Sequence, residues 1–211
     1  MRYDPPRPAG RLLLTPEDPE APARVRRLRE LGLGERPEPV LDAFADRLAE
    51  IAAVPYAMVN FLDAEGQFFA GLHRPGTLDI PGSPVTPDIP GSPGTPDIPG
   101  SPVSPGLSGL SGRRFARDHG FCPHVVFRRR ALALEDVRDY PRFAGNQVVD
   151  DLGIRSYIGA PLIDRTGVVL GTVCALDVQP RRWGLSGLET IKELAAELME
   201  RIHRRESEGL F

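Results

Sequence analysis

Cysteine is scarce in this sequence, with two residues, Cys122 and Cys174, among 211. Two cysteines do not make the disulfide framework of a small secreted protein. Long hydrophobic runs are also lacking: no stretch approaches the roughly 18–20 apolar residues of a membrane helix. Residues 1–10, rich in proline and arginine, contain no apolar segment typical of a secretory signal. We therefore expect a cytoplasmic protein with no membrane partner.

An excess of basic charge is lacking as well. The 26 Lys and Arg residues face 29 Asp and Glu, which gives a formal net charge of −3. Nucleic-acid-binding domains are usually basic, so this balance predicts no nucleic-acid partner, and we interpret the arginine clusters as solvated faces. The single lysine, Lys192, beside so many arginines is typical of a GC-rich bacterial genome.

Glycine and proline are abundant, and their surplus is concentrated in residues 76–112, which hold 9 of the 23 prolines and 8 of the 22 glycines. This segment repeats every nine residues and places proline at every third position from Pro81 to Pro105. That spacing favours a disordered or polyproline-like loop, because polyproline II has about three residues per turn. The alternative is a docking site for a proline-recognising module, although the segment has no Arg or Lys.

Hydrophobic periodicity predicts the remaining elements, with a loose tail before them that holds at most a short pairing segment at Arg11–Leu14. The expected helices are residues 22–31, 38–53, 121–127, 146–151 and 186–203, and the expected strands are 56–63, 67–72, 131–134, 156–164 and 168–177. Residues 136–143 are predicted to be a loop with aromatic side chains. Two hairpins imply antiparallel pairing, and helices at both ends can cover one face. The fold class is therefore α+β.

The last helix carries two specific predictions. Ser186 and Glu189 have the spacing of a capping box, in which each side chain accepts the other's free amide, so the helix should begin there. An apolar seam follows with 3–4–3–4 spacing. We expect this seam, with 41–51 beside it, to pair two chains into a homodimer; its members are Leu188, Ile191, Ala195, Leu198 and Ile202.

The chemically richest stretch is 117–126, where His119, Cys122 and His124 lie within six residues. A thiolate and two imidazoles can bind a soft metal. The spacing is not that of a zinc finger and no second ligand pair follows, so we expect no metal. No nucleophile motif, phosphate-binding loop or metalloprotease motif occurs.

Several motifs in order make the sequence recognisable as a relative of a known family. G-F-C-P-H-V-V, D-V-R-D-Y-P-R-F-A-G-N, G-A-P-L and G-T-V-C-A-L-D strongly resemble a bacterial GAF domain. The resemblance implies a central antiparallel sheet of about six strands, with the terminal helices on one face and a ligand pocket on the other. We expect one domain over 22–205, interrupted by 76–112, between tails 1–21 and 206–211.

The resemblance also suggests the site. The ligand pocket would be lined by Phe121, Cys122, His124, Tyr140 and Phe143. Bilin-binding relatives resemble one another in an adjacent Cys-His pair, which Pro123 interrupts here. Relatives that reduce free methionine sulfoxide carry a catalytic Cys in the region matching 146–153, where this chain has none. No permanently bound cofactor is expected.

Two functions follow as expectations. The first is a non-enzymatic sensory domain that binds a small molecule and signals by dimerisation or to a partner in trans. The second is a thiol- or metal-based redox sensor, or a methionine-sulfoxide-reductase-like enzyme, that uses Cys122 and Cys174. A third reading is that the pocket is collapsed and the domain only dimerises.

Overall fold

The computed structural model describes residues 18–64, 66–75 and 113–209. Within them lie seven helices and six strands. In chain order these are α1 (Ala21–Glu30), α2 (Pro39–Ala52), β1 (Tyr56–Leu62), β2 (Gly66–His73), β3 (Arg114–Ala116), α3 (Cys122–Arg128), β4 (Leu132–Leu134), the 3-10 helix η2 (Val137–Asp139), α4 (Pro141–Ala144), α5 (Gln147–Leu152), β5 (Ser156–Ile163), β6 (Val169–Asp177) and α6 (Gly184–Ser207). The segment 76–112 and Arg11–Leu14 lie outside the described residues.

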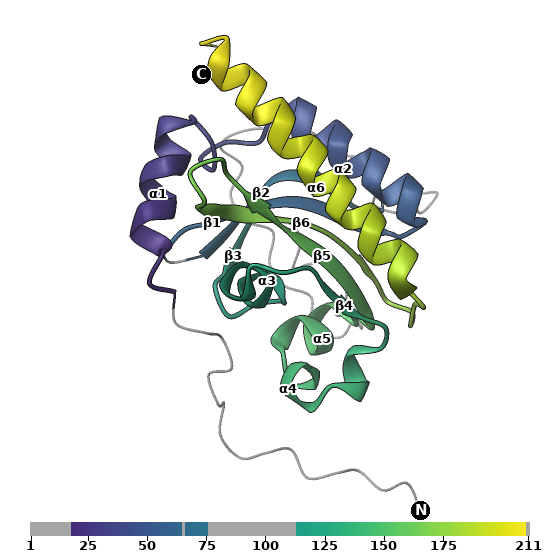
Figure 1. The fold of residues 1–211 in the computed structure, drawn as a ribbon. Coiled ribbons are helices and arrows are strands. Elements are labelled where there is room, and N and C mark those ends of the chain that lie inside the picture. Colours follow the sequence, from purple (N-terminus) through teal and green to yellow (C-terminus); the bar gives the residue numbers. More distant parts are fainter. Residues whose placement is uncertain (1–17, 65, 76–112, 210–211) are drawn as a thin grey trace, which may run out of the picture.

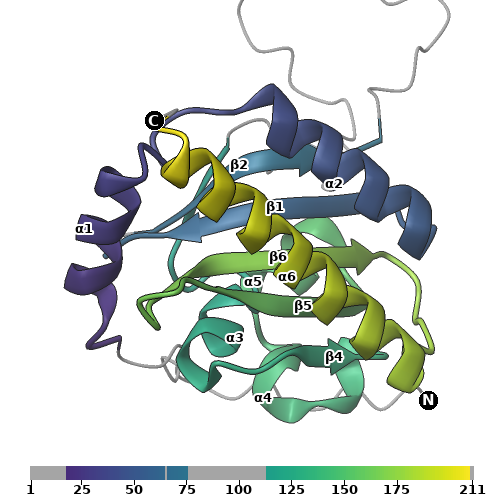
Figure 2. The ribbon, with the colours of Figure 1, turned by 45° about the horizontal axis from the view of Figure 1, so that its top comes forward.

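The six strands form one antiparallel sheet in the order β3-β2-β1-β6-β5-β4. Helices α2 and α6 lie side by side on one face, and α3, α4 and α5 cover the other (Figures 1 and 2). This arrangement confirms the predicted α+β class with terminal helices on one face. None of the helices in the described ranges is long and apolar enough to cross a membrane.

Each face of the sheet has its own apolar core, because side chains alternate between faces along a strand. On β6, Val173 and Ala175 join the core under α2 and α6, whereas Cys174 and Leu176 join the core under α3 and α5. All nine residues of β6 are buried. The sheet therefore separates two packed layers that share this central strand.

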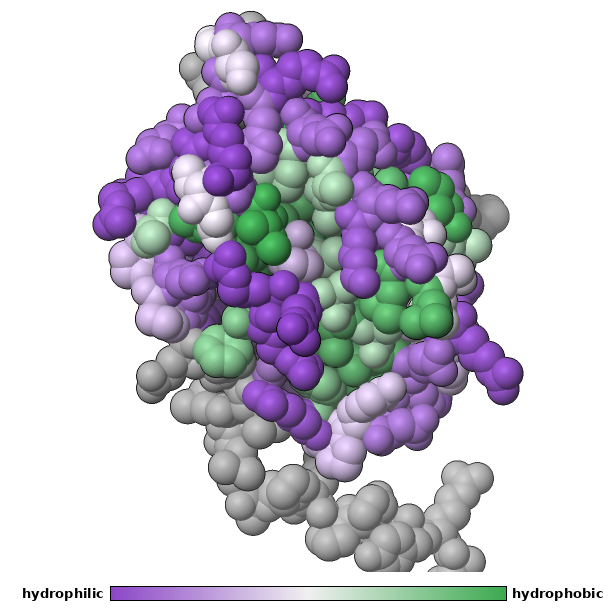
Figure 3. Space-filling view, viewed as in Figure 1, coloured by the Kyte–Doolittle hydropathy of each residue, from purple (hydrophilic) through white to green (hydrophobic). Residues whose placement is uncertain are grey.

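The apolar seam of α6 faces the sheet of its own domain. Ile191, Ala195, Leu198 and Ile202 are buried in the core against the strands, and Leu188 packs at its edge. The seam is therefore not a free surface for a second chain. Instead, a groove of about 570 Å³ runs beside α6, where apolar side chains gather below that helix (Figure 3). The groove is lined by Arg129, Arg130, Ala131, Ala160, Pro161, Ile163, Leu188, Lys192, Ala195, Ala196 and Met199.

The capping box at Ser186 is wrong, because α6 begins two residues earlier, at Gly184. Trp183 precedes that first turn, and its indole N–H donates to the carbonyl of Leu134 at 3.3 Å. This buried anchor fixes where the helix starts. Ser186 lies inside the helix, where its carbonyl accepts from the Thr190 hydroxyl at 2.9 Å.

Short elements also differ from expectation. The aromatic loop predicted at 136–143 contains η2 and α4, because Asp136 accepts the amide of Arg138 at 3.1 Å and Pro141 suits a first helical turn. Strand β3 was not predicted at all. It has three residues and pairs at the sheet edge with β2, so its sequence is too short to show a period.

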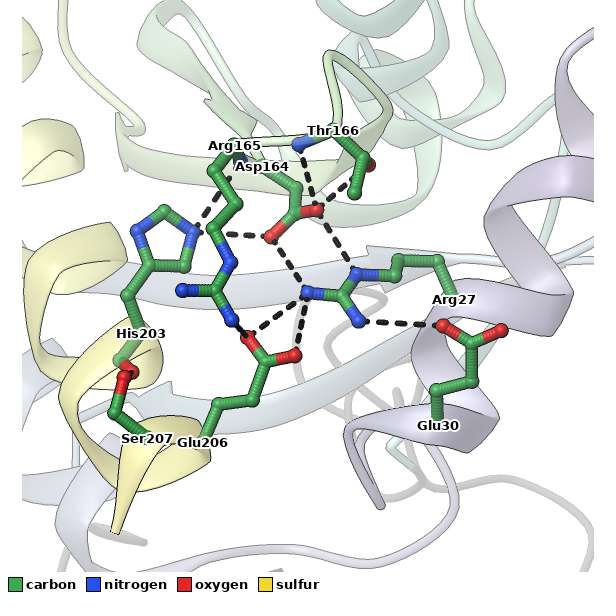
Figure 4. Close-up of polar contacts among 8 residues, drawn as sticks. All are labelled: Arg27, Glu30, Asp164, Arg165, Thr166, His203, Glu206 and Ser207. Carbon is green, nitrogen blue, oxygen red and sulfur yellow. Dashed lines mark hydrogen bonds and ion pairs between the residues drawn. The ribbon is translucent and has the colours of Figure 1, made fainter. Parts of the chain in front are cut away.

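A charged network joins three distant parts of the chain: α1, the β5–β6 turn and the end of α6 (Figure 4). At its centre, the Asp164 carboxylate accepts from Arg27 Nε at 2.9 Å, from the Thr166 hydroxyl at 2.7 Å and from the Thr166 amide at 3.1 Å. His203 Nε2 lies 3.0 Å from the same carboxylate. Arg27 also donates to both Glu206 oxygens, at 3.0 and 2.9 Å. These bonds attach α1 and α6 to the sheet.

Candidate functional site

The site begins at the turn before α3, which Asn146 holds in place. Its side-chain oxygen accepts the Gly120 amide at 2.9 Å, and its nitrogen donates to the carbonyls of Gly120 at 3.0 Å and Asp118 at 3.1 Å. The same oxygen also caps α5 by accepting the Val148 amide. Asn146 therefore ties α3 to α5. The asparagine that ends the D-V-R-D-Y-P-R-F-A-G-N motif thus holds together the helices α3 to α5 that lie on this face of the sheet, which we call the cover.

A small cavity lies between this cover and the sheet. Its volume is about 30 Å³, room for a water-sized molecule. The lining is mostly apolar and comes from five strands, α3, α5 and the connecting segments: Tyr56, Met58, Gln67, Phe69, Phe115, His119, Gly120, Phe121, Cys122, Val148, Leu152, Ile154, Tyr157, Cys174 and Leu176. The position agrees with the expected pocket face, and the volume shows that side chains nearly fill the pocket.

The expected ligand-contacting residues divide into two groups. Phe121 and Cys122 line the cavity. His124 and Phe143 pack against one another beside it, edge to face, with ring centroids 4.9 Å apart. Tyr140 is 38% exposed, and its ring centroid lies 6.5 Å from that of Phe143. His124, Tyr140 and Phe143 therefore do not line this cavity.

His124 is buried, with 3% of the residue exposed. Its burial, and then the nearby charges of Arg142 and Arg128, lower its pKa from 6.5 to about 4. The ring is thus neutral in the folded protein over most of the acidic range. Because the unfolded chain binds the proton first, stability should fall as pH drops from 6.5 towards 4.

We expect a His124→Gln variant to flatten this pH dependence. Between pH 6.5 and pH 4 the free energy of unfolding of the wild type should fall by up to about 2 kcal/mol. This is less than the full pKa difference implies, because solvent screens part of the charge. Melting temperatures measured at several pH values between 4 and 7 test this. Only the slope counts, since the substitution also changes the baseline stability; parallel wild-type and variant curves would contradict the assignment.

The two cysteines meet under the cover. Cys122 opens α3 and Cys174 lies in β6, yet their sulfur atoms are 3.7 Å apart. The hydroxyl of Tyr157 on β5 lies 3.5 Å from the Cys122 sulfur. Gly159 makes room for it, because a Cβ there would lie 2.3 Å from that hydroxyl. The hydrogen bond from Cys174 lowers the pKa of Cys122 and raises that of Cys174, so one thiol of the pair gives up its proton far more readily.

The weak metal candidates do not converge. Among the described residues, no three His, Cys, Asp or Glu side chains are placed to hold a metal ion. His119 faces Asp118 and Asp151, at 3.8 and 3.6 Å, whereas His124 faces Phe143. Cys122 faces Tyr157 and Cys174 instead of either histidine.

Sequence reasoning missed the strand residues that complete the site. Gln67 donates to the carbonyls of Ala116 at 3.1 Å and of His119, and accepts from buried Asn60 at 2.8 Å. Tyr56 lines the cavity, and its pKa is raised by burial and by Asp177. A buried strand shows few signals of this kind. Gly159 is the one signal in the sequence, because a glycine inside a strand often marks a place where another group approaches closely. Here that group is the Tyr157 hydroxyl.

Comparison with known proteins places this geometry in context. The chain is 32% identical over 97 residues to a cyclic di-GMP phosphodiesterase of Pseudomonas aeruginosa. That match covers 45% of this chain and 16% of the phosphodiesterase, so it concerns a small part of that protein.

Solved structures share the fold at low identity. The GAF domain of an Acinetobacter phosphoenolpyruvate-protein phosphotransferase is 16% identical, with 92% of this chain and 100% of that chain covered and a TM-score of 0.54. A free methionine-R-sulfoxide reductase from Neisseria meningitidis is 17% identical, with 77% of this chain and 75% of that chain covered and a TM-score of 0.51. The Thermosynechococcus elongatus PixJ GAF domain is 14% identical, with 88% of this chain and 92% of that chain covered and a TM-score of 0.50. At these identities, the likeness is one of fold.

The GAF domain family model matches residues 36–202, which is most of the chain. The match includes the strands that line the cavity and the helices that cover both faces. It confirms the resemblance carried by the F-C-P-H, R-F-A-G-N and G-T-V-C motifs. This chain belongs to the GAF domain family.

Proposed function

We propose that this GAF domain is a sensory module that binds a small molecule between the sheet and the α3–α5 cover. The observation that carries the proposal is the cavity itself, which has an apolar lining and a few polar groups from Tyr56, Gln67 and Tyr157. Such a lining suits a small, largely apolar ligand with one or two polar groups. We propose that the domain regulates rather than catalyses.

Because the cavity holds only about 30 Å³, a ligand larger than water must displace part of the cover. Helices α4 and α5 have four and six residues, so each contributes little stability on its own. Outward movement of this cover would be the response to binding. Signalling would then reach a second copy or another protein through the opposite layer, where Val40, Ile51 and Leu185 are exposed.

The test is a thermal-shift screen with metabolites ranging from amino acids and short carboxylic acids to nucleotides. A ligand at about 100 times its Kd stabilises by about 2.7 kcal/mol, which raises Tm by roughly 5–10 °C in a domain of this size. In a Val148→Phe variant, a phenyl ring fills the cavity and the shift should disappear.

Val178→Phe is the matched control, because Val178 is 37% exposed and lies outside the cavity lining. Each shift is measured against the variant's own baseline. Loss of the shift in Val148→Phe alone supports the proposal. A metabolite shift that survives in Val148→Phe, or a panel in which nothing stabilises the wild type, overturns it and favours a domain that acts only by dimerising.

A further inference from the structure

Cys122 and Cys174 are the two cysteines of the whole chain, 52 positions apart, and the fold brings their sulfur atoms to 3.7 Å. One belongs to the cover and the other to the central strand of the sheet. Both are buried, at 5% and 0% exposure. A bond between them would therefore add a covalent link between the cover and the sheet.

The surroundings favour one thiolate in this pair. The thiol of Cys174 and the hydroxyl of Tyr157 both lie within hydrogen-bonding distance of the Cys122 sulfur. Donors of this kind stabilise a thiolate, which is the reactive form of cysteine. Cys122 is thus the residue of the pair suited to attack an oxidant, and Cys174 is the neighbour suited to resolve the product.

The cavity limits which oxidant can arrive. It reaches both cysteines, but its volume of about 30 Å³ admits a molecule of about the size of water. Hydrogen peroxide is small, neutral and close to that size. Free methionine sulfoxide is far larger than this volume and would reach the sulfur atoms only after the cover had moved, so the geometry favours peroxide as the oxidant.

We propose that Cys122 and Cys174 are a peroxide-dependent disulfide site that controls the cover of this domain. The Cys122 thiolate attacks one peroxide oxygen; an S–O bond forms, the O–O bond breaks, and the departing hydroxide takes a proton to leave as water. The Cys174 sulfur then attacks the Cys122 sulfenic acid, so an S–S bond forms, the S–O bond breaks, and a second water leaves. Two thiols are oxidised and one peroxide is reduced.

The disulfide ties the first turn of α3 to β6. This consequence rests on the proposed function, in which a ligand enters by moving the cover. The oxidised domain would hold α3 against the sheet and admit no ligand, whereas the reduced domain would open. Reduction by a dithiol restores the open form, so the site sets whether the sensor can respond.

The first experiment counts thiols in the full chain after treatment with hydrogen peroxide. We expect free thiols per chain to fall from two to zero, with a mass lower by two hydrogen atoms and no cross-linked dimer on a non-reducing gel. Cys174→Ser should stop at a sulfenic acid that dimedone traps. Two thiols that survive, or a disulfide between two chains, overturn the proposal.

Tyr157→Phe keeps both cysteines and removes only the hydroxyl. It therefore tests the role of that hydroxyl even where a cysteine variant fails to fold. It should slow disulfide formation about tenfold, the effect of one hydrogen bond to a charged group. An unchanged rate means that Tyr157 does not assist Cys122 and contradicts that step. Free methionine-R-sulfoxide in place of peroxide should give no disulfide, and rapid oxidation by it would overturn the choice of oxidant.

The second experiment measures amide hydrogen exchange in α3 before and after oxidation. We expect the amides of Cys122 and of residues 124–128 to exchange at least tenfold more slowly in the oxidised protein, and equal rates overturn the proposed tie between α3 and the sheet. Neither readout needs a ligand. A protein that forms the disulfide but binds no metabolite overturns the proposed sensor alone, and one that binds metabolites but keeps both thiols overturns this site alone.

Discussion

Replacing Asp164 by alanine is expected to destabilise the domain by about 3–5 kcal/mol, which corresponds to a loss of roughly 10 °C in Tm. The Asp164 side chain is fully buried, and that of its partner Arg27 is 11% exposed. Removing the carboxylate leaves the guanidinium with only part of its counter-charge, from Glu206 and Glu30. Chemical denaturation of the wild type and the variant at neutral pH measures the difference.

The pH dependence provides a second test of Asp164. Burial alone would raise its pKa, but hydrogen bonds from Arg27, Thr166 and His203 outweigh burial and hold the pKa well below 3.8. The carboxylate therefore stabilises the fold above about pH 4, and this contribution disappears as pH falls further. The gap between the wild type and Asp164→Ala should narrow below pH 4.

The matched control for Asp164→Ala is Glu197→Ala. Glu197 pairs with Arg47, and both side chains are more than a third exposed. Such a pair contributes less than about 1 kcal/mol. If the two alanine variants lose similar stability, the network of Figure 4 does not hold α1 and α6 to the sheet as its hydrogen bonds indicate.

Gly171→Ala is expected to cost about 3 kcal/mol, at the upper end of overpacking effects. An added Cβ at this position on β6 would lie 1.9 Å from the Asn60 carbonyl oxygen and 2.8 Å from the Phe61 Cα. Both obstacles are backbone, so no side chain can rotate away, and β1 must shift against β6. Tm and the denaturation midpoint should both fall.

Gly145→Ala is the control for this glycine. A Cβ at Gly145 meets nothing within 4 Å, and the backbone there has a negative φ of −92°. Stability should change by less than about 0.5 kcal/mol, as for ordinary surface substitutions. A tolerated Gly171→Ala would mean that β1 and β6 are less tightly paired than the register indicates.

Periodic segments made most of the fold predictable from the sequence. The 3–4 spacing of Leu41, Phe44 and Leu48 requires a helix with one buried side, and α2 buries all three. The hairpins follow from apolar runs around short turns. The start of α6 could not be predicted, because the long-range anchor of Trp183 on Leu134 takes precedence over the local capping signal at Ser186. Local sequence does not contain that contact.

The candidate site was predictable only in part. Phe121 and Cys122 belong to a motif, and motif residues can be transferred one by one. The meeting of Cys122 with Cys174 depends on how α3 lies across β6, which sequence spacing does not encode. His124 has the same motif status as Cys122 but points to Phe143. Which residues of this motif reach the cavity therefore depends on which side of the short helix α3 each side chain lies.

The burial of β6 on both faces has a consequence for how the domain transmits a change. Cys174 is one of the two paired thiols and packs under α3. Its two neighbours along the strand, Val173 and Ala175, pack instead in the layer of α2 and α6. A close-packed interior cannot absorb a shift of this strand locally. If the proposed disulfide forms, a single peptide unit of β6 separates the bonded sulfur from the layer of α2 and α6, so this strand would carry any resulting shift to the outer helices.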